Sequence, residues 1–319
     1  MFQFVLRRIT IFPITLLIAN FIGFAFAFTT APIVASSNPY AAKASELPPI
    51  LPIYFDYLLN VFKGDFGNTF TNEPVMETIS RFGTASLGLI GIAMTISIII
   101  GILLGRLAVR QSKSGVASWL TLISTIGLAL PSFYIAILLI AIFVLITIYV
   151  MSSTAPPIPF QGFGWDAHLI LPVLTLTIQP TVKIAQVTAG LLSEEMGKQY
   201  VTAAMSFGHP FRIIKRKFAF RSILAPVVLT IAAALRIMIA ELIIIERLFN
   251  WPGMGRLIAT LLSRHSASDD LLSPPMIAAI LTILVGTFLM IDFIATFISR
   301  LIDPRLRSDS ELQFKGAGA

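Results

Sequence analysis

The densest group of charged side chains lies between residues 200 and 221, in the stretch YVTAAMSFGHPFRIIKRKFAFR. Only 12% of the chain is charged, yet five of its 23 basic residues fall there: Arg212, Lys215, Arg216, Lys217 and Arg221. Gly208 suits the left-handed position that ends a helix, and Pro210 suits the first turn of the next one. We therefore predict two short helices joined by a sharp turn, and we call residues 200–221 the elbow. It is either a docking site for another protein or a set of cations that fixes membrane topology at lipid headgroups.

Other residue types that could do chemistry are poorly placed for it. The chain has no cysteine, which excludes disulfides and thiolate metal sites, and its histidines (His168, His209 and His265) lie in three separate segments without metal-ligand spacing. The stretch GLLSEEMGKQ resembles a phosphate-binding loop, but six residues separate its glycines and Gln199 stands where Ser or Thr is needed. The sequence thus predicts no metal, no cofactor, no catalytic site and no enzyme activity of its own.

Composition identifies the class of protein. Hydrophobic residues make up 56% of the chain and the mean hydropathy is +0.87, which a soluble globule does not show. Residues 9–42, 82–105, 114–165 and 271–291 contain no charged side chain, and each run is long enough to cross a bilayer core of about 30 Å. A pI of 9.9 would suggest nucleic-acid binding in a soluble chain, but in a membrane protein it marks cytoplasmic loops. We predict an all-α polytopic membrane protein.

Six spans are expected, near residues 9–30, 83–106, 119–149, 168–190, 223–246 and 276–299. The first apolar run exceeds twenty residues, so it fits a retained span better than a cleaved signal peptide. The third is over-long, and Pro131 either kinks it or marks a start in the interface. Gly101 and Gly105 form a GxxxG pattern, which we interpret as close helix packing.

The basic residues predict an orientation. With the N-terminus inside, segments 1–8, 106–118, 191–222 and 300–319 hold fifteen of the 23 basic residues, and the outer segments hold six. This bias places both termini in the cytoplasm. Two long outer segments, 31–81 and 247–275, are expected to contain short amphipathic pieces that pack on the outer membrane face.

The elbow resembles the coupling loop of ATP-binding-cassette (ABC) importer permeases, through Ala203, Ala204 and Gly208, with Thr202 where that motif carries Glu. A more specific likeness, to the B-type permease of dipeptide and oligopeptide importers, covers nearly the whole chain. It rests on seven stretches in that family's order: GDFGNTF (64–70), LALPSF (128–133), HLILPVLTL (168–176), YVTAAMSFG (200–208), LAPVV (224–228), FNWPGMGRL (249–257) and DPRLR (303–307).

The resemblance implies a type I importer transmembrane domain (MetI-like) in a bacterial or archaeal plasma membrane. Its organisation would be a first span with a long extracytoplasmic segment (1–80), a transmembrane core (81–307) with the coupling loop at 193–222, and a cytoplasmic tail (308–319). Its partners would be a homologous second permease, two cytoplasmic ATPase subunits that bind ATP and Mg, and an extracytoplasmic substrate-binding protein. The residues implied to contact the ATPase are Tyr200, Ala203, Ala204, Phe207, Gly208, Phe211, Arg212, Lys215 and Arg216.

Five charged residues fall within or at the edge of the expected spans, where each mid-helix charge costs about 2.5–3.5 kcal/mol: Lys183, Arg236, Glu241, Glu246 and Asp292. Arg236, Glu241 and Asp292 either line a translocation cavity that contacts peptides or form a structural ion pair between Arg236 and Asp292. Lys183 and Glu246 are expected near span ends, where their side chains snorkel to water.

The chain departs from the family pattern in places. Arg264 is followed by His265 and SASDD where relatives tend to carry Arg-Asp, and Asp292 and Thr296 stand where they carry Asn and an acid. The substrate therefore stays open between peptides, nickel chelates and oligosaccharides. The rival function is an ion-coupled secondary transporter, which predicts inverted repeats and discontinuous spans. A third interpretation, a structural scaffold, does not explain charged spans.

Overall fold

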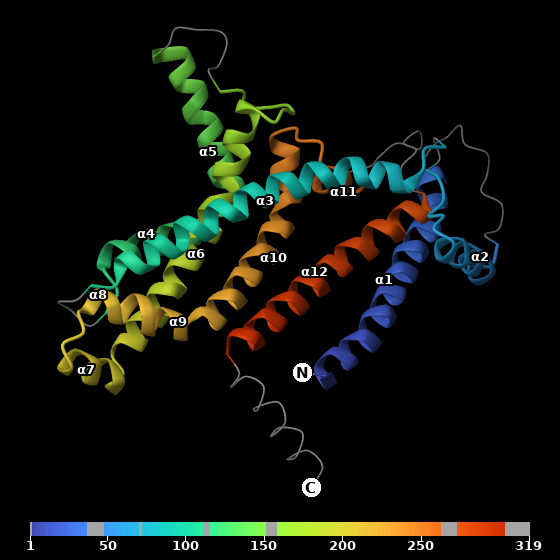
Figure 1. The fold of residues 1–319 in the computed structure, drawn as a ribbon. Coiled ribbons are helices and arrows are strands. Elements are labelled where there is room, and N and C mark those ends of the chain that lie inside the picture. The colour runs from blue at the N-terminus through green and yellow to red at the C-terminus, as the bar shows by residue number, and fades with distance from the viewer. Residues whose placement is uncertain are drawn as a thin grey trace. The chain divides into compact units, whose positions relative to one another are not determined.

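The computed structural model describes residues 2–36, 48–69, 72–110, 115–150, 158–262 and 273–303. Most of them are helical, which confirms the predicted all-α fold (Figure 1). The chain divides into two compact units, Met1–Ser86 with Pro252–Ile291 and Leu87–Trp251 with Asp292–Ala319. The expectations for Arg264, His265 and the tail 308–319 concern parts of the chain outside the described residues.

Within the described residues, six helical stretches are long and apolar enough to cross a membrane, as predicted. They correspond to α1 (Phe2–Ser36), α3 (Val75–Ala108), α5 (Ser132–Leu145) with the following π-helix η1 (Ile146–Val150), α6 (Ile170–Met196), α10 (Leu224–Leu248) and α12 (Pro274–Ile302). The second span differs from its prediction, because α3 begins at Val75 rather than near residue 83. Glu77 lies in its first turn, where the helix dipole favours an acid.

The third predicted span is two separate helices rather than one over-long helix. α4 (Ser118–Ala129) ends before Leu130, whose φ of −91° and ψ of 119° are extended, and α5 starts immediately after Pro131. A residue that precedes proline is pushed out of the helical region, which explains the break. The side-chain amide of Gln179 in α6 donates a hydrogen bond of 2.5 Å to the Leu130 carbonyl, so a backbone group at the break is satisfied within the protein.

The first unit contains α1, α2 (Ile50–Phe62), α11 (Met254–Leu262) and the larger part of α12. Phe24, Tyr54, Tyr57 and Ala278 form one buried cluster there. A second cluster joins the start of α3 to α11 and α12. The helices α2 and α11 are the short amphipathic pieces expected between the spans.

The second unit is built around α6, which lies against α4, α5 and α10. Of the most apolar window of α6, 61% is buried, compared with 28% or less for each other span. The prediction of close packing at the GxxxG pattern is confirmed. A Cβ atom added at Gly101 would lie 2.9 Å from the Thr181 carbonyl oxygen, and one at Gly105 would lie 2.7 Å from that of Ala185. The backbones of α3 and α6 therefore approach too closely for any side chain at these two positions.

Candidate functional site

The first half of the elbow is the helix α7 (Gln199–Ser206), and Gly208 lies in the turn that closes it, as predicted. Gly208 has a φ of +82°, the left-handed conformation that glycine adopts without strain. Its N–H donates to the Met205 carbonyl at 2.9 Å, and the N–H of His209 donates to the Ala204 carbonyl at 3.2 Å. This pair of bonds is the Schellman motif, which satisfies the last carbonyls of the helix and fixes the direction in which the chain leaves it.

The second half of the elbow is less regular than predicted. It consists of α8 (Phe211–Ile213), the π-helix η3 (Ile214–Ala219) and α9 (Phe220–Ser222), and it leads into α10. Pro210 lies at the N-cap rather than in the first turn, because its ψ of 142° is extended. π-helical turns are rare and are found mostly at functional sites.

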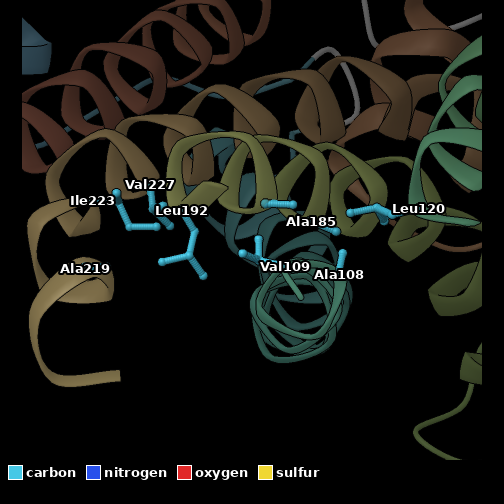
Figure 2. Packing of buried hydrophobic residues seen from close by; sticks show 9 residues of the cluster. Ala108, Val109, Leu120, Ala185, Leu192, Ala219, Ile223 and Val227 are labelled. Carbon is cyan, nitrogen blue, oxygen red and sulfur yellow. The ribbon is translucent and has the colours of Figure 1, made fainter. Parts of the chain in front are cut away.

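A buried apolar cluster connects the elbow to the spans of the second unit. Ala219, Ile223 and Val227 pack together with residues from the C-terminal end of α3, from α4 and from α6, as Figure 2 shows. The cluster also includes Ala108, Val109, Leu120, Ala185, Ala189 and Leu192. Val201 in α7 and Ile214 in η3 are fully buried as well. Close-packed side chains therefore join the elbow to α3, α6 and α10.

Polar contacts also hold α7 to the end of α6. Glu195 accepts hydrogen bonds from the Lys198 ammonium at 2.5 Å and from the Tyr200 hydroxyl at 3.0 Å. Burial, followed by the bond to Glu195, raises the pKa of Tyr200 to about 12, while a bond from Ser222 acts in the opposite direction. Tyr200 therefore stays a neutral donor at physiological pH. The role of Glu195 could not be predicted from the sequence, because an acid at a helix end is common and its spacing does not indicate a bond to Tyr200.

The family resemblance implies that Lys215 contacts the ATPase, but its ammonium makes a hydrogen bond within the chain. Its ammonium donates a 2.7 Å hydrogen bond to the Val109 carbonyl at the end of α3, and it lies 5.7 Å from the Phe211 ring centre. Burial, and then the nearby charge of Arg106, lower the pKa of Lys215. Lys215 thus caps a helix C-terminus, where a cation is favourable. The sequence could not predict this contact because it joins residues 106 positions apart.

Among the other residues implied to contact the ATPase, Phe207 is the most exposed apolar side chain. Phe207, beside the Gly208 turn, is 84% exposed, and Ala203, Arg212 and Arg216 are exposed too. Met205 and Ile213 add partly exposed apolar surface. An exposed aromatic side chain held on a well-defined turn is suited to insertion into an apolar groove.

The structure brings together two of the charges expected within the spans. Arg236 in α10 and Asp292 in α12 form a salt bridge, and their side chains are 37% and 44% exposed. Glu241, about one turn further along α10, accepts a hydrogen bond from the hydroxyl of Ser132 at the start of α5. Its Oε2 atom is buried without a hydrogen-bond partner within the described residues. The Arg236–Asp292 pair thus neutralises both charges and still leaves them accessible.

Two expectations about snorkelling side chains are wrong. Glu246 is fully buried, so its carboxylate does not reach water. Lys183 lies in the middle of α6, because that helix runs on to Met196 rather than ending near residue 190. Beside Glu246 the chain turns after α10: the Trp251 N–H donates to the Glu246 carbonyl at 2.8 Å, and Asn250 has a φ of 55°. This turn folds the fully buried Trp251 ring against Phe163 and Trp165.

Six apolar helical stretches and a charged pair within them are features of a polytopic membrane protein. Residues 97–308 match the family described as binding-protein-dependent transport system inner membrane component, and the chain belongs to that family. It is the membrane-spanning permease subunit of an ABC importer.

Curated relatives cover most of the chain. It is 30% identical over 269 residues to the oligopeptide transport system permease protein OppB of Haemophilus influenzae, which covers 83% of each chain. It is 29% identical over 268 residues to the probable peptide ABC transporter permease protein y4tP of Sinorhizobium fredii, covering 81% of this chain and 80% of that one. The dipeptide transport system permease protein DppB of Lactococcus lactis is 25% identical and covers 96% of this chain and 100% of its own length.

The fold also has a solved counterpart. A chain of the MetNI methionine ABC transporter in inward-facing conformations superposes with a TM-score of 0.55, covering 72% of this chain and 99% of that chain. The sequence identity is 17%, so this likeness concerns the fold alone. It agrees with the MetI-like transmembrane domain predicted from the sequence.

Proposed function

We propose that this permease transports di- or oligopeptides and forms half of the translocation pathway, with a homologous second permease supplying the other half. The relatives that match over four-fifths of the chain or more are named as peptide, dipeptide or oligopeptide permeases. An extracytoplasmic binding protein delivers the peptide, and both termini of the permease lie in the cytoplasm. Fifteen of the 23 basic residues on the cytoplasmic side support this orientation.

The elbow couples transport to two cytoplasmic ATPase subunits, which bind ATP and Mg. The observation that carries this proposal is the 84% exposure of Phe207, in a loop of the chain that is held at its two sides by the fully buried Val201 and Ile214. Insertion of Phe207 into a groove on the ATPase subunit would anchor the elbow to that subunit. When ATP closes the ATPase pair, α3, α6 and α10 move with the elbow, because a close-packed cluster joins them.

Arg236, Glu241 and Asp292 line the pathway and contact the charged termini or the backbone of the peptide. Their partial exposure supports this role, since a charge within a membrane span that faces lipid would be costly. In the resting state, without bound peptide, the charges of Arg236 and Asp292 are paired in their salt bridge. A peptide with a carboxylate at one end and an ammonium at the other can replace both partners at once, so the pair exchanges one ionic contact for two.

The function is tested by ATP-dependent uptake into proteoliposomes that contain the permease, its second permease and both ATPases, with the binding protein added outside. We expect uptake of labelled dipeptides or oligopeptides only when all components and ATP are present. Uptake driven by an ion gradient with the permease alone would instead establish the rival secondary transporter. ATP-dependent uptake of a nickel chelate or an oligosaccharide, but of no peptide, would keep the ABC mechanism and overturn the peptide substrate.

A double-mutant cycle separates the two roles of the charged pair. Arg236→Met or Asp292→Asn alone leaves one charge unpaired, so we expect each single variant to lose folded protein and transport. The double variant restores the folded yield, which is measured by size-exclusion chromatography, but peptide uptake stays at least about tenfold below wild type. Recovery of both yield and uptake in the double variant would show that the pair is structural only.

A further inference from the structure

A cavity of about 660 Å³ lies where the end of α3 meets the second half of the elbow. Five of the side chains that line it are cationic and none is acidic; the cations are Arg106, Arg212, Lys215, Arg216 and Lys217. Its volume is in the range of ordinary ligand sites. Five positive charges around one cavity repel one another, so the site is arranged for an anion.

Two of these cations are already engaged in contacts that hold the cavity in shape. The Lys215 ammonium donates to the Val109 carbonyl, and the Arg106 guanidinium lies 4.9 Å from the ring centre of Phe220. The charge of Arg106 contributes to the lowered pKa of Lys215, and an anion between them would relieve that repulsion. Arg212, Arg216 and Lys217 form no ion pair with any carboxylate that the structure describes, and all three are exposed.

The apolar part of the cavity wall indicates where the anion comes from. Leu103 and Leu107, in the last turns of the α3 span, also line the cavity and are 52% and 59% exposed. A cationic cavity that continues into exposed leucines at the end of a membrane span matches the two parts of a phospholipid. Neither α7 nor Phe207 contributes to the lining, so the cavity lies apart from the proposed Phe207 anchor. Its lining does include Phe211, Arg212, Lys215 and Arg216, which the family resemblance implies contact the ATPase, so the test must distinguish the two roles.

We propose that this cavity binds the phosphate headgroup of an anionic phospholipid, with Arg212, Arg216 and Lys217 contacting the phosphate and Leu103 and Leu107 contacting the acyl chain. Basic pockets beside membrane spans bind anionic headgroups through the same combination of charge and apolar contact. A bound lipid would tie the second half of the elbow to the end of α3. The elbow would then be most rigid in membranes that contain anionic lipid.

The test compares lipid retention by the purified full-length chain in native mass spectrometry, with phosphatidylglycerol or phosphatidylcholine as the probe. Wild type is expected to retain phosphatidylglycerol in preference to phosphatidylcholine, and added salt should weaken only the former. The variant Arg212→Gln/Arg216→Gln/Lys217→Gln should weaken phosphatidylglycerol retention on the order of a hundredfold, at roughly fivefold per cation lost. The charge-matched control Lys63→Gln/Arg81→Gln/Arg247→Gln changes three exposed cations elsewhere and should retain the lipid.

A second measurement applies even if the neutralised variant does not fold. A photoreactive benzoylphenylalanine in place of Leu107 should form adducts with phosphatidylglycerol and far fewer with phosphatidylcholine in mixed nanodiscs. Equal retention or labelling of the two lipids would overturn the proposal. So would competition by soluble glycerol phosphate at the same concentration, which would make the cavity a site for free anions. Loss of ATPase binding with unchanged lipid retention in the neutralised variant would assign the cations to the protein partner instead.

Discussion

Phe207→Ala is expected to weaken binding of the ATPase subunits by at least about thirtyfold while the permease stays folded. Buried aromatic anchors at the centre of an interface contribute about 2 kcal/mol or more, which corresponds to that factor. Phe207 is 84% exposed and belongs to none of the buried clusters found among the described residues, so its truncation mainly removes an intermolecular contact. The measurement is the dissociation constant between the permease complex in nanodiscs and the purified ATPase subunits, together with ATP-dependent peptide uptake.

The matched control is Phe62→Ala in α2, where a phenylalanine is 75% exposed and lies outside the elbow. It removes a similar apolar area, so any general effect of lost surface hydrophobicity on yield appears in both variants. We expect the control to bind the ATPase and transport peptide as wild type does. Equal ATPase affinity in the two variants would show that Phe207 is not the anchor, and the coupling role would then have to lie with another exposed residue of the elbow.

Much of the architecture is encoded locally and could be predicted from the sequence. Uncharged runs of twenty or more residues must be helical spans, because lipid offers no partner for backbone groups. Gly208 followed by Pro210 ended α7 at the expected place, since only a left-handed glycine turn closes a helix without strain there. The GxxxG pattern at Gly101 and Gly105 likewise predicted close helix packing, and there the backbone of α3 lies against that of α6.

The sequence could not predict features that depend on distant contacts or on how a break is satisfied. Pro131 predicted a kink or a helix start, but the sequence could not show that the Leu130 carbonyl at the break would bond the side chain of Gln179, 49 positions away. Lys215 looked like an ordinary surface cation until α3 supplied the Val109 carbonyl as its acceptor. Glu246 was expected to reach water at a span end, but it is fully buried beside the turn to Trp251 after α10. In each case the local sequence predicted the helix or turn, whereas the contacts of the individual residue depend on the tertiary structure.

Gly105→Leu is expected to have the largest effect on folding. A Cβ atom at this position would lie 2.7 Å from the Ala185 carbonyl oxygen and 2.7 Å from Thr188 Cβ, distances that real Cβ atoms do not show. The carbonyl belongs to a helix backbone and cannot rotate away, so α3 and α6 must separate. Overpacking of this kind costs about 3 kcal/mol, and here it also disrupts the neighbouring cluster at Ala108 and Val109. We expect a loss of monodisperse protein in size-exclusion chromatography and a melting temperature lower by several degrees, roughly 5 °C or more.

Gly91→Leu is the control, because Gly91 lies on the same helix with nothing within 4 Å of an added Cβ. Both substitutions replace glycine by a good helix former, so a difference between them measures the α3–α6 contact rather than helix propensity. Wild-type stability of Gly105→Leu would mean that the two helices do not meet at this position. Because the elbow is packed against the same ends of α3 and α6, partial unpacking in the milder variant Gly105→Ala should lower transport per ATP hydrolysed even where the protein remains folded. A loss of coupling with intact ATPase binding would identify this contact as the route by which movement of the elbow reaches the spans.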